Sequence, residues 1–315
     1  MSTHQLISEE EPVCRAWQRF VQAVIILFLV LTAVVLAHYL APGNSGKLQQ
    51  QVRTLSQQVQ ELQQQQEMPS LVLSRYRNSI CYIFGIYQIG FPNHPAAQRT
   101  RISGTGFVVG DRLIATNRHV AEPWYGDPDA DELLDRGATP HLEKLVAYFP
   151  GSPEPVNLTP AILSPDGDLA IVHMNTDPGL NLKPLPLAAQ NPGAGELVAV
   201  VGYPMGVLGM MAKAPTPVYA RLAFRHDDQG TASELAALSL IRPSATCGHL
   251  GDIVGDKLIY DAPTAHGASG GPVFNSQGEV IGVNAAYIDG FSGGTLGISS
   301  QALKPLIEQA HKKGF

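Results

Sequence analysis

Cysteine and runs of like charge are both scarce in this chain of 315 residues. The three cysteines, Cys14, Cys81 and Cys247, are too scattered for a disulfide framework, and none has the CxxC or Cys/His spacing of a zinc site. In an oxidising compartment Cys81 and Cys247 either pair or remain two buried thiols, and the second arrangement is the more ordinary one. No block of five or six like charges occurs and the formal net charge is -6, so nucleic acid is not an expected partner.

Charged residues make up only 15% of the chain, whereas hydrophobic residues make up 44%. This composition excludes a chain that is disordered throughout. Much of the hydrophobicity lies in residues 20–40, which contain no Asp, Glu, Lys or Arg. A segment of this length crosses a bilayer as a helix, so the sequence predicts a transmembrane segment there.

Two alternatives to a retained transmembrane helix remain. A buried core helix is rarely apolar on every face over this length. A cleaved signal peptide would use Ala37 as the small residue before its cleavage site, but Glu9, Glu10 and Glu11 stand where a signal peptide has basic residues. A retained anchor is therefore favoured.

Basic residues near the ends of this segment predict its orientation. Arg15 and Arg19 precede it, and the first basic residue after it is Lys47. The positive-inside rule then places residues 1–19 in the cytoplasm. The remainder of the chain is expected in the periplasm or outside the cell.

A heptad pattern follows in residues 41–70. Five apolar residues recur among glutamines at spacings of 4, 3, 4 and 3, namely Leu48, Val52, Leu55, Val59 and Leu62. This seam predicts a coiled-coil stalk that joins chains into a membrane-bound homo-oligomer, and Pro69 should end its helix. Since so short a seam is marginal in water, a Gln-rich disordered linker is the alternative.

Residues 71–315 consist of short runs of Val, Ile, Tyr and Phe between Gly, Pro, Asn and Asp, which predicts an all-β domain. Strands are expected at residues 79–89, 106–109, 112–116, 144–149, 168–174, 197–202, 218–224, 257–261, 272–274 and 279–286. A helix is expected only at residues 300–312. This length suits one large β unit or two barrels in tandem.

Three short segments carry residues suited to acyl transfer. His119 lies at the exit of an expected strand, Asp168 begins another after a Pro-Asp-Gly turn, and Ser269 is flanked by glycines just before a third. A partly buried carboxylate needs a partner, and glycines allow N–H groups to point to one spot beside a serine. Each segment alone is weak evidence, but the three together predict an active site.

These segments resemble the trypsin-like serine peptidases, and residues 71–315 look like the branch that contains the Deg/HtrA proteases and the bacterial glutamyl endopeptidases. The stretches that carry the resemblance are residues 116–120, 167–172, 260–261, 267–275, 279–284 and 294–300. The resemblance implies a chymotrypsin-like double β-barrel with a C-terminal helix, and endopeptidase activity on unfolded or extended polypeptides. In contrast to most Deg/HtrA proteins, no PDZ domain is expected.

The resemblance also implies a role for each site residue. His119 would be the general base, Asp168 would orient it, and Ser269 would be the nucleophile. The backbone N–H groups of Gly267 and Ser269 would form the oxyanion hole. Asp166 is the rival carboxylate, but its place in the Pro-Asp-Gly turn favours solvent exposure. This chemistry requires no cofactor and no metal.

The sequence departs from the family pattern around the serine. Ala268 stands where these families commonly carry Asn and where the zymogen-activated digestive enzymes carry Asp to bind a newly cut N-terminus, so activation by such a cut is not expected. Thr264 matches the threonine that receives an acidic substrate side chain in glutamyl endopeptidases, but Asn284 replaces the expected histidine. Pro263 supplies no charge for Lys or Arg, and His266 is expected at the rim of the pocket. A small or medium apolar side chain is the expected preference.

An acidic segment with Asp127, Asp129 and Asp131 invites comparison with a calcium loop. Glu132 stands where an EF-hand needs Gly and Ala138 where it needs an acid, so an acidic surface loop is expected instead. The alternative to a peptidase is a catalytically inactive binding or scaffold protein on a membrane-anchored stalk. The presence of all three catalytic residue types favours the enzyme.

Overall fold

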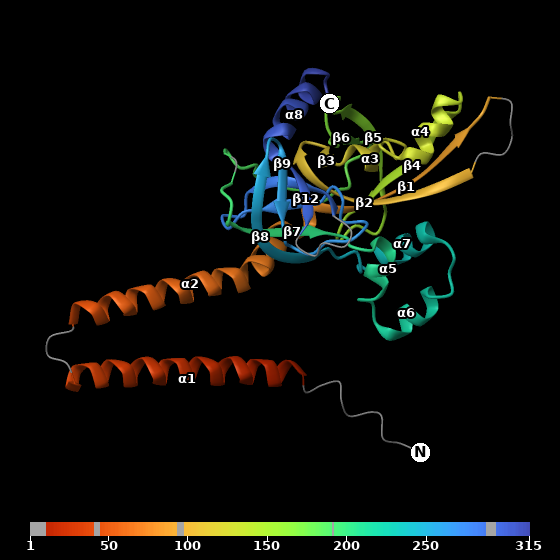
Figure 1. Cartoon of the computed structure of the whole chain (residues 1–315). Helices are drawn as coiled ribbons and strands as arrows, with labels where there is room; N and C mark the ends of the chain where they lie inside the picture. Colours follow the sequence, from red (N-terminus) through yellow and green to blue (C-terminus); the bar gives the residue numbers. More distant parts are fainter. Residues whose placement is uncertain (1–10, 41–44, 93–97, 191, 288–293) are drawn as a thin grey trace, which may run out of the picture. The chain divides into compact units, whose positions relative to one another are not determined.

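The computed structural model describes residues 11–40, 45–92, 98–190, 192–287 and 294–315 (Figure 1). The chain divides into two compact units, Met1–Gln63 and Gln64–Phe315. Helix α1 (Glu11–Leu40) belongs to the first unit. Its stretch Arg19–Ala37 is long and apolar enough to cross a membrane by length and composition, and none of it is buried. The helix therefore fits the transmembrane segment that the sequence predicts.

Helix α2 (Ser45–Tyr76) continues through Pro69, so the expectation that this proline ends the helix was wrong. Proline removes one backbone hydrogen bond from a helix interior. Packing offsets this loss, because Met68 and Val72, one helical turn apart, are buried in the core of the second unit. Tyr76 extends the contact by stacking on Phe274, with ring centroids 5.4 Å apart.

The second unit contains two closed antiparallel β-barrels, as the resemblance implies. The first barrel has the strand order β1 (Ile80–Gly90), β2 (Gln98–Gly110), β3 (Leu113–Thr116), β6 (Ala170–Met174), β5 (Val156–Leu163) and β4 (Thr139–Tyr148). The second has the order β10 (Pro272–Phe274), β11 (Val280–Tyr287), β12 (Thr295–Ser299), β9 (Lys257–Tyr260), β8 (Ser244–Val254) and β7 (Leu197–Gly202). The predicted C-terminal helix is α8 (Leu303–Lys312). The all-β double barrel with a terminal helix is confirmed.

Helices between β7 and β8 are the main departure from the expected strands. Figure 1 shows α5 (Gly206–Met211), α6 (Thr216–Leu222) and α7 (Asp228–Ala237) grouped beside the barrels. The strand predicted at residues 218–224 was wrong, because that stretch forms α6 and the turn after it. Pro217 in the first turn favours the helix, and Leu222 is its one fully buried residue.

The acidic segment also forms a helix where a loop was expected. Helix α4 (Pro128–Asp135) has Asp127 as its N-cap, whose Oδ1 accepts from the N–H groups of Asp129 at 3.0 Å and Ala130 at 3.4 Å. A carboxylate there offsets the unpaired donors and the positive end of the helix dipole. Asp127 therefore has a structural role. The short helix α3 (Arg118–Ala121) precedes this region.

Cys81 and Cys247 are free thiols with different surroundings. Cys81 is buried in the first barrel, with its sulfur 3.5 Å from the carbonyl oxygen of Gly106. Cys247 lies on β8 and is exposed, so the expectation of two buried thiols holds for Cys81 and was wrong for Cys247. Alternating side chains on a strand point to opposite faces, and Cys247 is on the outer one.

The buried acids Cys81, Tyr82, Tyr203 and Tyr260 predict a loss of stability in alkali. Burial raises the pKa of all four groups, so the folded protein keeps them neutral. In the unfolded chain they ionise at about pH 8.5 for cysteine and about pH 10 for tyrosine. Their contribution is therefore complete below about pH 8 and declines as the pH rises through the unfolded-state values.

We expect the urea concentration at the midpoint of unfolding to decrease as the pH rises from 8 to 10.5. The decrease should be smaller in Tyr82→Phe, which has one buried acid fewer. Urea titrations of both proteins across this range measure the effect. A midpoint that does not change up to pH 10.5 would contradict the prediction.

Candidate active site

The two barrels meet at Thr105 on β2. Its backbone N–H donates to the carbonyl of Ser269 at 2.8 Å, and its hydroxyl donates to the carbonyl of Gly267 at 2.7 Å. The same hydroxyl accepts from the N–H of Tyr203 at 3.1 Å. Thr105 is fully buried, so these bonds are shielded from water. Thr105 is not among the site residues predicted from the sequence, since its only local signal is its position between two glycines.

His119 and Asp168 are joined by two hydrogen bonds. The imidazole Nδ1 lies 2.7 Å from Asp168 Oδ2, and the backbone N–H of His119 donates to Asp168 Oδ1 at 2.9 Å. Both carboxylate oxygens are thus bonded to one residue. When Nδ1 carries the proton of a neutral ring, Nε2 presents a lone pair. The ring is therefore fixed in orientation and can accept a proton at Nε2.

The loop that carries Asp168 is tied to the helix that carries His119. Asn117 Nδ2 donates to the carbonyl of Asp168 at 2.8 Å, and Arg118 Nη1 donates to the carbonyl of Ser164 at 2.8 Å. The rival Asp166 is exposed. The structure therefore pairs His119 with the carboxylate that the sequence favours.

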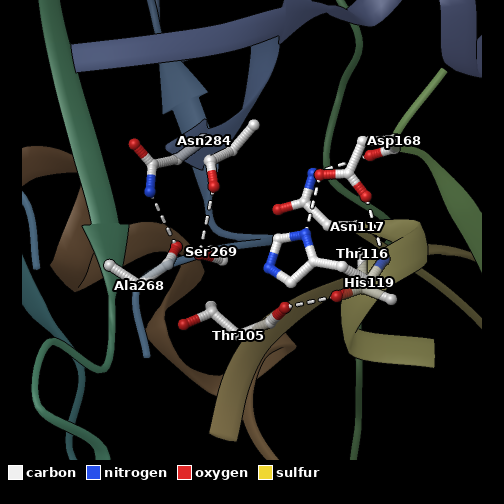
Figure 2. A network of polar contacts seen from close by, with 9 residues as sticks. Thr105, Thr116, Asn117, His119, Asp168, Ala268, Ser269 and Asn284 are labelled. Carbon is white, nitrogen blue, oxygen red and sulfur yellow. Dashed lines mark hydrogen bonds and ion pairs between the residues drawn. The ribbon is translucent and has the colours of Figure 1, made fainter. Parts of the chain in front are cut away.

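Ser269 lies in a turn of residues 266–271, here called the serine turn. Gly267 and Gly270 have φ angles of 88° and 86°, a region that favours glycine. A Cβ on Gly270 would overlap the carbonyl of Thr105 and the hydroxyl of Thr116. The chain thus packs against the first barrel one residue after Ser269, and Figure 2 shows the ring of His119 between Asp168 and Ser269.

Hydrogen bonds hold the carbonyls of the serine turn. The carbonyl of His266 accepts from the N–H of Met205 at 2.6 Å, and that of Ala268 accepts from the N–H of Gly271 at 3.0 Å. Both peptide bonds are trans, so the next N–H groups, of Gly267 and Ser269, point away from these carbonyls. Neither N–H donates to another backbone group in the described part of the chain. Two adjacent donors therefore remain available beside the serine.

The residues predicted for the substrate pocket divide into two kinds. Asn284 Nδ2 donates to Thr264 Oγ1 at 3.2 Å, so these two side chains contact each other as expected for neighbouring pocket walls. Asn284 is buried, whereas Thr264 is half-buried. His266 and Pro263 are exposed. The exposure of His266 agrees with a position at the rim.

A cavity of about 600 Å³ adjoins Asp168 and Ala285. The hydroxyl of Ser269 donates to the carbonyl of Ala285 at 3.1 Å, so one of the residues that line the cavity also contacts the serine. Both barrels and α8 line it, and its apolar walls include Leu169, Ala286, Leu296, Ile298 and Leu306. An extended apolar segment can bind in such a groove. Among the described residues, no cluster of three or more His, Cys, Asp or Glu is placed to hold a metal.

Comparisons with known proteins bear on the family and the fold of the chain. A family model for the trypsin-like peptidase domain matches residues 104–283. A probable periplasmic serine endoprotease DegP-like of Brucella suis biovar 1 is 27% identical over 226 residues, which cover 70% of this chain and 35% of that protein. A glutamyl endopeptidase of Staphylococcus aureus strain MW2 is 27% identical over 224 residues, which cover 66% of this chain and 54% of that protein.

Among solved structures, an HtrA-type protease with a decapeptide matches with a TM-score of 0.52 at 15% identity, over 78% of this chain and 67% of that one. This similarity concerns the fold. The chain spans between about a third and about half of the length of these two curated relatives. Because the family model covers more than half of the chain, and includes His119, Asp168 and Ser269, the chain belongs to the family of trypsin-like peptidase domains.

Proposed function

We propose that this chain is a serine endopeptidase that uses His119, Asp168 and Ser269 as a catalytic triad. The observation that carries the proposal is the double hydrogen bond from His119 to Asp168, with distances of 2.7 and 2.9 Å. It fixes an imidazole beside a serine whose neighbouring N–H groups are available as donors. This combination is what acyl transfer to a serine requires.

The first chemical step is attack of Ser269 Oγ on the scissile carbonyl carbon. His119 Nε2 takes the hydroxyl proton, and Asp168 stabilises the resulting imidazolium. The N–H groups of Gly267 and Ser269 donate to the oxygen that becomes negative in the tetrahedral intermediate. The peptide C–N bond then breaks, and His119 returns the proton to the leaving amine.

The acyl-enzyme that remains is hydrolysed by the same groups. His119 takes a proton from water, whose oxygen attacks the ester carbonyl, and Ser269 leaves with that proton. In the structure the Ser269 hydroxyl donates to the carbonyl of Ala285 at 3.1 Å. Rotation of this side chain would exchange that bond for one to His119 Nε2, in keeping with hydrogen bonds that tighten only when substrate is bound.

Extended polypeptides are the proposed substrates. The cavity beside Ala285 offers apolar walls to the residues on the acyl side of the scissile bond. Thr264 and Asn284 bond to each other, and Pro263 carries no charge, so neither an acidic nor a basic side chain has an obvious partner in the pocket. A small or medium apolar side chain before the scissile bond fits these residues best.

The proposed enzyme is anchored in a membrane through α1. The basic residues Arg15 and Arg19 favour a cytoplasmic N-terminus and place the barrels in the periplasm or outside the cell. The Brucella relative is named a probable periplasmic endoprotease, and this name supports the proposed location. The heptad seam of α2 would join the anchored chains into a homo-oligomer.

A fluorophosphonate probe tests the proposed chemistry, because it reacts with an activated serine. We expect the full chain in detergent to be labelled at Ser269, as located by peptide mapping, and Ser269→Ala and His119→Ala to remain unlabelled. Trypsin labelled in parallel is the positive control. Folded wild-type protein that stays unlabelled would overturn the proposal in favour of an inactive binding or scaffold protein.

A further inference from the structure

Asn284 on β11 binds the serine turn on both sides of the nucleophile. Its backbone N–H donates to the carbonyl of Gly271 at 2.8 Å, and its own carbonyl accepts from the N–H of Gly270 at 2.8 Å. Its side-chain Nδ2 donates to the carbonyl of Ala268 at 3.0 Å (Figure 2). One residue thus contacts the positions immediately before and after Ser269.

The remaining atoms of this amide are bonded as well. The second hydrogen on Nδ2 faces Thr264 Oγ1 at 3.2 Å, and Oδ1 accepts from the hydroxyl of Tyr260 at 2.7 Å. Asn284 is 1% exposed and Tyr260 is fully buried. A flipped amide would place Oδ1 against the carbonyl of Ala268, which cannot donate. The three partners therefore fix the orientation of the amide and leave it no free group for a substrate.

The bond to Ala268 controls the direction of a catalytic donor. The peptide between Ala268 and Ser269 is trans, so holding its carbonyl on one side directs the N–H of Ser269 to the other. Turning this peptide over would break the bonds from Asn284 Nδ2 and from the N–H of Gly271 together. The methyl group of Ala268 can make no such bond itself.

Asn284 is the side chain that reaches this peptide. The carbonyls of the two preceding residues are held elsewhere: that of His266 accepts from the backbone N–H of Met205, and that of Gly267 accepts from the hydroxyl of Thr105. Each carbonyl is therefore fixed from a different part of the second unit. The direction of the Ser269 N–H therefore depends on β11. The residue after Asn284 in this strand is Ala285, whose carbonyl accepts a hydrogen bond from the serine hydroxyl.

We infer that Asn284 is a positioning residue that keeps the N–H of Ser269 directed at the oxyanion, and not a group that binds the substrate side chain. This inference rests on the proposed peptidase function. It predicts that loss of Asn284 weakens binding of the transition state while binding of the ground-state substrate changes little.

Asn284→Ala and Tyr260→Phe form a matched pair, since each removes one buried hydrogen-bonding group from the same network. Only the first removes the bond to Ala268. The full chain is assayed in detergent with a fluorogenic peptide whose cleavage depends on Ser269, and the aldehyde of the same peptide is the inhibitor. The aldehyde forms a hemiacetal with Ser269 whose oxygen needs the oxyanion donors.

We expect Asn284→Ala to lower kcat about 10- to 100-fold, less than the loss of a whole oxyanion donor because Gly271 still holds the carbonyl. KM should change less than threefold, and the affinity for the aldehyde should fall by the same factor as kcat. Tyr260→Phe should keep kcat within about threefold of the wild-type value, even if it lowers the melting temperature as much as Asn284→Ala does. Asn284→Ser carries the same expectations and is used if Asn284→Ala does not fold.

Two outcomes would overturn the positioning role and leave the proposed function in place. One is an equal loss of kcat in Asn284→Ala and Tyr260→Phe, and the other is an unchanged affinity for the aldehyde in an Asn284 variant whose kcat is lowered. A rise in KM with kcat preserved would make Asn284 a substrate-binding residue and would also overturn it. Wild-type protein without cleavage that depends on Ser269 would instead overturn the proposed function, and the inference with it.

Discussion

Replacing Ser269 with alanine should lower kcat for peptide hydrolysis by about 10⁴-fold or more, and His119→Ala should do the same. Both residues act in one step, so the double variant should be little slower than either single variant. The fold should survive, because Ser269 and His119 are only partly buried and, among the described residues, the serine hydroxyl bonds only to the carbonyl of Ala285. Release of peptides from casein measures the rate, and circular dichroism monitors the fold.

Asp168 and Asp166 provide a matched comparison of two carboxylates in one loop. Asp168→Asn should lower kcat by about 10⁴-fold, because the amide can turn its NH₂ toward His119 and favour the wrong tautomer. Asp166→Asn removes the same charge two residues earlier, from an exposed side chain, and should change kcat less than about threefold. A large loss in Asp166→Asn with normal turnover in Asp168→Asn would exchange their roles. Normal turnover in Ser269→Ala or His119→Ala would remove that residue from the triad.

The positions of His119, Asp168 and Ser269 could be proposed from the sequence because each depends on a local signal. A strand exit, a Pro-Asp-Gly turn and a glycine-flanked serine are readable within about ten residues. The structure brings the His119 and Asp168 segments together through hydrogen bonds of 2.7 and 2.9 Å. The order of the segments in the chain supplied the remaining specificity.

The residues whose hydrogen bonds hold the serine turn could not be predicted from local sequence signals in the same way. Thr105 bonds Gly267 across 162 positions of the chain, and its role depends on how the two barrels pack. Asn284 could be assigned to the pocket by its position after Val283, but the direction of its amide depends on Tyr260, Thr264 and Ala268. Such partners are set by strand register and packing, which a single sequence does not specify.

Helix boundaries show where local signals were present and where packing prevailed. Asp127 followed by Pro128 is a readable start of a helix, with an N-cap residue and then proline in the first turn. Pro69 is a readable stop, yet α2 continues because Met68 and Val72 are buried in the core of the second unit, to which they belong. The first signal was available in the sequence, whereas the second was overridden by contacts between distant residues.

The heptad seam of α2 leads to a prediction about assembly. Val52, Leu55, Val59 and Leu62 are 39%, 57%, 42% and 58% exposed, so within the described chain the seam lacks a partner that covers it. Apolar residues at heptad spacing are buried when helices from two or more chains pack together. Anchoring in one bilayer would raise the effective concentration of the chains, which offsets the weakness of a short seam.

We therefore expect Leu55→Asp combined with Leu62→Asp to convert a homo-oligomer of the full chain into a monomer. In a symmetric bundle each new carboxylate would lie near its copy in the neighbouring chain, where burial and like charge both oppose association. Gln50→Asp combined with Gln57→Asp adds the same charge on the opposite face of the helix, so this control should remain assembled. Light scattering and chemical crosslinking in detergent give the mass of each species. If the wild type and both double variants run at one mass, the seam does not assemble the chain, and residues 41–70 act as a linker.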